Sequence, residues 1–452
     1  MKNSLAQKLV LASSLVAALA LTGCSALSPI AATAPLQGSA LKGRVMGGQQ
    51  PVSFATVQLW ATSTSGYGSA STALITSASA AVNNASYPVM TDAGGNFAIT
   101  GDFTCPTPST TPVYITITGG NPGNGGGILN PNLALMAALG PCNNLVNIPF
   151  VNISEISTVA SVWALSSFMT DMTHIGTSSS NMTGMALAMA AVNKLYNLGS
   201  GTIGGPALPT GATLPADEIY GLADILSVCI NSTGGVATDT STNCGKLFSL
   251  VKPGVTAPTD TVTAAMNIAQ NPSFNADALW RTIPSIGAVF ATSVGSPAAW
   301  TIAINYTGGG LSTPKGIAND ASGNVWLPNA GNNSVTELSN TGVAQSGTNG
   351  YTAVGAFNLP SAIAIDSSNN PWVTNFGNGS LTKLSSAGTP GTPITGNGLS
   401  TPKSISFDPI GNIWMVNYGS NSVSAFTGTG AAIGNYTGGG ISTPIGIAVN
   451  PQ

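Results

Sequence analysis

The side chains that most often carry acid–base or metal chemistry are scarce in this sequence. Among 452 residues there is one histidine, His174, and the three glutamates, Glu155, Glu218 and Glu337, lie far apart along the chain. A histidine without a second histidine or a nearby cysteine lacks the ligand set of a zinc site. The sequence also contains no G-x-S-x-G, H-E-x-x-H or G-x-x-x-x-G-K-[ST] motif. The residues therefore predict no catalytic site, no metal and no cofactor.

Five cysteines are the remaining reactive side chains: Cys24, Cys105, Cys142, Cys229 and Cys244. Without Cys24, the other four allow three disulfide connectivities, between which the sequence alone does not choose. We favour the two local pairs, Cys105–Cys142 and Cys229–Cys244. No C-x-x-C spacing is present, which disfavours a zinc or redox role.

Cys24 stands apart because of what precedes it. Lys2 and Lys8 flank the start of a twelve-residue apolar segment, residues 9–20, which is too short for a membrane span. Residues 21–24 (LTGC) then resemble a bacterial lipobox, and the resemblance implies a signal peptide over residues 1–23 and a lipid on Cys24. The alternative is an ordinary secretory signal. We expect a flexible tether over residues 24–40 and a lipid anchor at the outer membrane or the cell surface.

The composition narrows the classes of partner. Only 6% of the residues are charged and the net charge is −3, whereas 43% are hydrophobic. Such a chain is not a disordered polyelectrolyte. It has no basic patch either, so nucleic acid is not expected as a partner.

Residues 41–125 alternate apolar and polar side chains in short runs that turn clusters separate, which is typical of β-strands. The pattern "LKGRV…QPVSFATVQLW…TDAGGNFAI" resembles carboxypeptidase-regulatory-like modules, and this resemblance implies a β-sandwich. Asp92 begins the turn DAGGN, for which we expect a hairpin role in preference to calcium binding.

Residues 126–295 change to helical spacing, and we interpret them as an α-helical domain. Ser154 is positioned to cap the first helix, and Asp260 lies at the start of the last. The expected helices cover residues 155–171, 184–198, 216–229 and 259–270.

Residues 300–452 repeat with a period near 42, which is typical of propeller blades. The order P-x-x-I-A-x-D-x-x-G-N-V-W resembles NHL repeats and streptogramin-lyase propellers. Each repeat predicts an inner strand that ends at an aspartate, followed by a tryptophan that packs between blades. Three full repeats are present, with an outer strand expected over residues 300–306 and a further inner strand over 445–449. The repeats are marked by Pro314, Pro360, Pro402 and Pro444, by Asp320, Asp366 and Asp408, and by Trp326, Trp372 and Trp414.

The resemblance to the lyases supports the fold more than the activity, because the repeats contain no histidine. After each tryptophan, Asn329, Asn375 and Asn417 occupy equivalent positions. Their amides could bind a neutral polar ligand such as a glycan or peptide, or each could hold its own turn. The expected fold class is multidomain and mainly β, with a sandwich, a helical domain and a partial propeller of about three blades. We expect a binding or scaffold protein that takes a glycan or protein ligand, with self-association through open propeller edges. The alternatives are a lyase-like enzyme or a remnant of a longer propeller protein.

Overall fold

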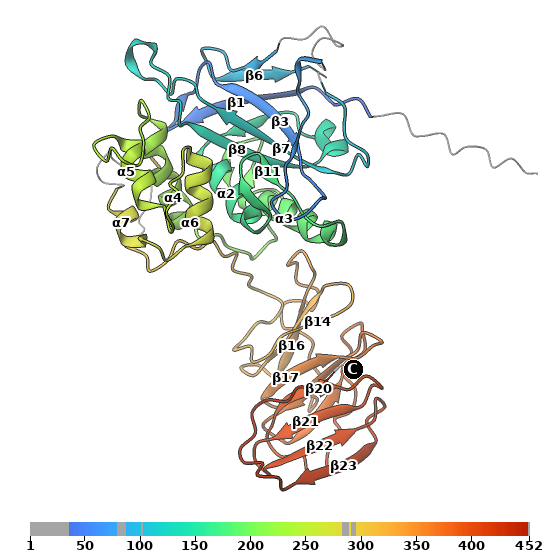
Figure 1. Ribbon diagram of the computed structural model, residues 1–452. Helices are drawn as coiled ribbons and strands as arrows, with labels where there is room; N and C mark the ends of the chain where they lie inside the picture. Colours follow the sequence, from blue (N-terminus) through green and yellow to red (C-terminus); the bar gives the residue numbers. More distant parts are fainter. Residues whose placement is uncertain (1–35, 79–86, 101–102, 283–288, 291–294, 451–452) are drawn as a thin grey trace, which may run out of the picture.

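The structure, a computed structural model, describes residues 36–78, 87–100, 103–282, 289–290 and 295–450 (Figure 1). The expected signal peptide and Cys24 lie outside these residues. The fold is mainly β, with several separate sheets. Two parts are visible in Figure 1: a mixed α/β part that contains residues 36–300, and a stack of small sheets that follows it. Across the described residues, no helix combines the length and the apolar character needed to cross a membrane.

Two sheets form the β-structure of the first part. In one, β1 lies between β2 and β6 and also pairs in parallel with β9; in the other, the order is β4-β3-β7-β8, and β5 pairs with β3. Buried and less buried residues alternate along β1 and β3, as a sheet with one covered face requires. The strands are β1 (Leu41–Gly47), β2 (Gln50–Pro51), β3 (Thr56–Ala61), β4 (Thr72–Ala73), β5 (Val89–Met90), β6 (Asn96–Ile99), β7 (Pro112–Thr118), β8 (Ala134–Pro141) and β9 (Val151–Ile153).

The four expected helices form, with differences at their ends, and two shorter helices, α5 and α7, were not expected. Ser154 begins α2 in a capping box with Ser157, and Asp260 caps α6 by accepting from the backbone N–H of Thr263 at 2.8 Å. The first helix is shorter than expected because a 3₁₀ turn, Ser166–Phe168, leads into a small hairpin of β10 (Met169–Asp171) and β11 (His174–Ile175). The helices are α2 (Glu155–Leu165), α3 (Met182–Leu195), α4 (Ala216–Ile230), α5 (Asn243–Leu250), α6 (Thr261–Gln270) and α7 (Ala276–Trp280), with β12 (Tyr196–Asn197) and β13 (Thr202–Ile203) after α3.

Sheets and helices share one hydrophobic core that runs from Leu41 to Trp300. The expected division at residues 125/126 does not coincide with a break in this core, because β8 and β9 lie beyond it and belong to the two sheets. The free edge of β8 is covered by hydroxyls from the helices. The backbone N–H groups of Met136, Ala138 and Ala134 donate to Thr158 and Ser161 on α2 and to Thr261 on α6, at 3.0, 2.9 and 2.9 Å. These bonds protect an edge that would otherwise be open to pairing.

The second part consists of three antiparallel sheets that we name blades 1, 2 and 3. Blade 3 has four paired strands, whereas single bridges such as Val335↔Tyr351 and Leu381↔Ile394 replace the fourth strand in blades 1 and 2. One apolar cluster lies between blades 1 and 2, and another lies between blades 2 and 3. The strands are β14 (Ala318–Asn319), β15 (Val325–Asn329) and β16 (Ser334–Leu338) in blade 1, β17 (Pro360–Ile365), β18 (Pro371–Asn375) and β19 (Ser380–Lys383) in blade 2, and β20 (Pro402–Phe407), β21 (Ile413–Asn417), β22 (Ser422–Phe426) and β23 (Ala432–Thr437) in blade 3.

Two expected strands do not form. Residues 300–306 make a single bridge, from Asn305 to Thr213 of the first part, and Trp300 is buried in the first part's core. Residues 445–449 have no strand partner, and Ile445 is 70% exposed. A strand needs a neighbour for its backbone hydrogen bonds, and at neither end of the blades does the structure place an adjacent sheet for these segments.

Replacing Trp300 with alanine should destabilise the first part. Its indole N–H donates to the carbonyl of Ala276 at 3.2 Å, and the side chain has no exposed surface. We expect a loss of about 3–5 kcal/mol, because a large cavity opens in the core. Chemical denaturation followed by near-UV circular dichroism measures it. Trp414→Ala in blade 3 is the control, and its first-part transition should not move. Equal effects of the two variants would contradict this assignment.

Candidate functional site

The aspartates of the repeats form the turns that the sequence predicts. In blade 2, Asp366 Oδ1 accepts from the backbone N–H groups of Ser368 and Asn370 at 2.9 and 2.8 Å, and Oδ2 accepts from the Trp372 indole at 3.0 Å. Asp320 and Asp408 make the equivalent three bonds. Burial raises the pKa of each aspartate, but these donors outweigh it and hold the pKa below its usual value. The motif is therefore structural, and it fixes the tryptophan of each blade.

The three asparagines are also occupied inside their blades. Asn375 is fully buried, and its Nδ2 donates to the hydroxyls of Ser380 and Thr382, both at 2.9 Å. Its Oδ1 accepts from the backbone N–H of Asn358 at 3.2 Å. Asn329 repeats this arrangement with a serine and a threonine, and Asn417 repeats it with two serines, each with its own backbone N–H partner. With both amide donors used and no exposed surface, these side chains favour the internal role over ligand contact.

The tryptophan of blade 3 differs in its burial from the tryptophans of blades 1 and 2. Trp326 lies in the cluster between blades 1 and 2 and Trp372 in the cluster between blades 2 and 3, both with no exposed surface. This agrees with the expected packing role. Trp414, at the same position of blade 3, faces away from blade 2 and is only half-buried. It stacks on Tyr436, with ring centroids 5.7 Å apart.

Both ends of the stack leave residues more exposed than their equivalents inside the stack. The trailing face, formed by Trp414, Val423 and Tyr436 on blade 3, has Tyr436 47% exposed. The leading face lies on blade 1, where Ile317 is 66% exposed, although its equivalents Ile363 and Ile405 are only 7% and 8% exposed. The stack thus ends in two different unpartnered apolar surfaces.

His174 lies at a hairpin turn of the first part. Its Nδ1 is 2.9 Å from Asp171, whose Oδ1 also accepts from the backbone N–H and the hydroxyl of Thr173. No group of three or more histidine, cysteine, aspartate or glutamate side chains suited to a metal is found where the structure is described. At Asp92 the turn has the expected hairpin role, because Oδ1 accepts from the backbone N–H groups of Gly94 and Asn96, both at 2.8 Å.

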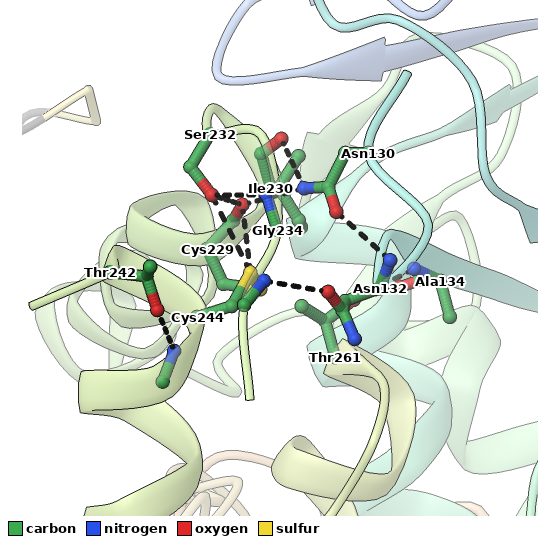
Figure 2. Close-up of a disulfide and its surroundings, with 12 residues drawn as sticks. Asn130, Asn132, Ala134, Cys229, Ile230, Ser232, Gly234, Thr242, Cys244 and Thr261 are labelled. Atoms are coloured by element: carbon green, nitrogen blue, oxygen red, sulfur yellow. Dashed lines mark hydrogen bonds between the residues drawn. A yellow bond between two sulfur atoms is a disulfide. The ribbon is translucent and has the colours of Figure 1, made fainter. Parts of the chain in front are cut away.

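The four cysteines form the two expected local disulfides, Cys105–Cys142 and Cys229–Cys244. Figure 2 shows that the second bridge links the end of α4 to the start of α5. Asn130 donates to the carbonyls of Cys229 and Ile230 at 2.8 and 3.1 Å, which ties this end of α4 to the loop before β8. The bridge therefore stabilises the packing of the helices against the sheet.

A cavity that the motifs did not indicate lies where the β1–β2 turn meets α2 and α4. Its volume is about 540 Å³, and Glu155, the first residue of α2, lines it without having exposed surface. Glu155 Oε1 accepts from the backbone N–H of Gly48 at 2.7 Å, whereas Oε2 has no partner. Burial raises the pKa of Glu155 to about 7. A lone glutamate at a helix start gave no sequence signal, because its burial depends on a turn about one hundred residues earlier.

The glycine at position 48 favours that contact. Its φ is +54°, a left-handed conformation, and a Cβ atom there would lie 1.7 Å from the amide nitrogen of Asn231. A side chain at this position would therefore adopt an unfavourable backbone conformation and displace the Asn231 side chain.

No family model matches the sequence, and no curated protein matches it. Among solved structures, the chain is similar to a streptogramin B lyase, at 22% identity over 30% of this chain and 45% of that chain, with a TM-score of 0.27. It is similar to a catalytically inactive virginiamycin B lyase from Staphylococcus aureus with quinupristin, at 20% identity, 32% and 48% coverage and a TM-score of 0.29. A gluconolactonase from Xanthomonas campestris gives 17% identity, 34% and 57% coverage and a TM-score of 0.27. The chain spans about half the length of these proteins. The description of its repeats as propeller-type blades rests on their own strand order and packing.

Asn375→Ala should destabilise the blades. The change leaves the hydroxyls of Ser380 and Thr382 and the backbone N–H of Asn358 without their buried partner, so we expect a loss of about 2–4 kcal/mol in denaturant unfolding. Asn349→Ala, at an exposed position, should stay within about 0.5 kcal/mol of the parent protein. If Asn375→Ala leaves stability unchanged, the internal role of the asparagine is wrong.

Proposed function

We propose that this chain is an exported, lipid-anchored protein of the cell envelope that binds or scaffolds other proteins through the open faces of its blades. The observation that carries the proposal is the partial exposure of Trp414, whose equivalents Trp326 and Trp372 are fully buried, beside Tyr436, which is 47% exposed. Monomeric proteins rarely expose contiguous apolar patches unless these bind something. A protein is the better candidate than a glycan, because the polar amides that would recognise a sugar are buried in the blades.

A second copy of this chain is the partner that fits the trailing face best. Inside the stack, the side of a blade that carries the tryptophan always meets the side that carries Ile363 or Ile405. The leading face of blade 1 has the same type of surface, with Ile317 at the equivalent position. A trailing face and the leading face of another copy would therefore repeat a contact that this chain makes twice already. Such a contact is heterologous, so it can close a ring or extend a chain of copies.

The lipid anchor is supported by the order of residues before Cys24, and an exported location agrees with the two disulfides. Disulfides persist in oxidising compartments and are rare in the cytosol. The expected tether of residues 24–40 is too long at its end, because residues 36–38 pair with residues 103–105. A protein held by lipid on the remaining residues 24–35 would keep its blades free to meet a partner.

Cys24→Ala should release the protein from membranes. The substitution removes the thiol that would carry the lipid, and the described part of the chain has no spanning helix to replace it. Membrane fractionation and intact-mass analysis test this, with Cys105→Ala as a control that removes a cysteine without removing the anchor. An unmodified Cys24 in the parent protein contradicts the proposed anchor.

Self-association should depend on both faces. Sedimentation velocity of the unlipidated full chain should show a concentration-dependent oligomer, and Tyr436→Arg or Ile317→Arg should each give a monomer. A mixture of the two variants should form a heterodimer, because each retains the face that the other lacks. Val354→Arg, at a fully exposed apolar residue outside both faces, is the control. A parent chain that stays monomeric at about 100 μM, well above the Kd of an ordinary stable interface, contradicts the proposal.

A further inference from the structure

The cavity beside Glu155 combines apolar walls with an acid that lacks a partner. Tyr220 and Phe290 stack with ring centroids 6.0 Å apart and planes 5° from parallel, and Met46 and Ile156 add aliphatic surface. Glu155 Oε2 is buried and accepts no hydrogen bond. No lysine, arginine or histidine is among the described residues that line the cavity.

A second buried acid lies behind this wall. Asp224 on α4 has no exposed surface; its Oδ1 accepts from the backbone N–H groups of Val289 and Phe290 at 2.7 and 3.0 Å, and its Oδ2 has no partner. The negative charge of Asp224 acts on Glu155 and raises its pKa further, in addition to burial. The local field is therefore that of two acids without a basic partner in the described structure.

We propose that this cavity binds a small organic amine, whose ammonium group pairs with Glu155 once the buried carboxylate turns toward the cavity, while its apolar body lies along Tyr220 and Phe290. The inference is independent of the blade surfaces and adds a small-molecule site to the first part of the chain.

The chemistry of the cavity selects the ammonium group over other ligands. The ionised Glu155 carboxylate can accept a further hydrogen bond at Oε2. An anion would therefore be repelled, and a ligand must bring a hydrogen-bond donor. A hard metal ion needs six or more oxygen ligands, usually with several carboxylates, whereas Glu155 is the only carboxylate among the described residues that line the cavity. A neutral hydroxyl could donate as well, but only a cation gains from the charges of both acids, and aromatic faces favour cations further.

The proposal predicts a dependence on pH. The groups that face Glu155 are Asp224 from α4 and Tyr196 from β12. Burial raises the pKa of Tyr196 still further above neutral pH, so this side chain stays uncharged over the range of the test. An ammonium group pairs with the ionised form of Glu155, and burial raises the pKa of Glu155 to about 7, so near neutral pH the acid must lose its proton when the ligand binds. Below about pH 6 the affinity should fall about tenfold for each unit of pH, since one proton is then released for each ligand bound.

Calorimetric titration of the full chain with 2-phenylethylammonium at about pH 8 tests the site, since the amine is then still protonated and Glu155 is ionised. We expect binding of one ligand per chain, and at least about tenfold weaker binding by Glu155→Gln, which keeps the shape and removes the charge. Neutral 2-phenylethanol, the matched probe, should bind at least about tenfold more weakly than the amine, for the same reason.

Two further variants keep the test decisive. Ser200→Trp fills the mouth of the cavity from an exposed position, so it should abolish binding even if Glu155→Gln is poorly folded. Asp239→Asn makes the same change of charge in an exposed loop and should bind as the parent does. The proposal is overturned if the amine does not bind at millimolar concentration, if Ser200→Trp binds it unchanged, or if the alcohol binds as tightly as the amine.

Discussion

Neutral hydrogen bonds from hydroxyl and amide side chains hold this structure together. Only 6% of the residues are charged, and three ion pairs are found in the part of the chain that the structure describes. Thr158, Ser161 and Thr261 satisfy the edge of β8, and Asn375 with its equivalents joins strands within each blade. Such bonds stabilise only when every buried partner is present. Each sheet therefore depends on geometry more than on charge, and salt should affect the fold little.

Repetition of the blades gives the stack surfaces that match one another. The tryptophan side of one blade packs against the isoleucine side of the next blade at both contacts, so the contact between blades is of the same kind each time. Repeat proteins of this type gain stability from neighbour contacts, and their ends need a cap or a partner. The segment that follows Trp300 covers blade 1 in part, since Gly309 accepts from Thr336 and Ser346. Nothing equivalent is described over Tyr436.

Features that follow from a local pattern could be predicted from the sequence. The helix expected over residues 216–229 is α4 at Ala216–Ile230, and the turn at Asp366 has the bonds that its position in the repeat indicates. Features that depend on distant partners could not. The strand expected at residues 445–449 lacks a neighbour. β8 lies in the segment that we expected to be helical, but it pairs with β7 of the preceding segment, and such pairing depends on tertiary contacts. An asparagine is suited both to contact a ligand and to join neighbouring strands, so the sequence alone did not predict that the Asn375 side chain is buried.

The buried polar atoms that lack a hydrogen-bond partner are not spread evenly over the structure. Within the described ranges, four buried side-chain atoms lack a partner, and two of them are carboxylate oxygens on the neighbouring helices α2 and α4, Glu155 Oε2 and Asp224 Oδ2. A chain that pairs its buried hydroxyls and amides so thoroughly gains no stability from burying two acids that repel each other. Locally unfavourable features, such as buried polar atoms without a partner, are concentrated at the functional sites of proteins. One orphan acid lines the cavity and the other lies behind its wall at Phe290, and this arrangement favours a ligand that neutralises them over a defect of packing.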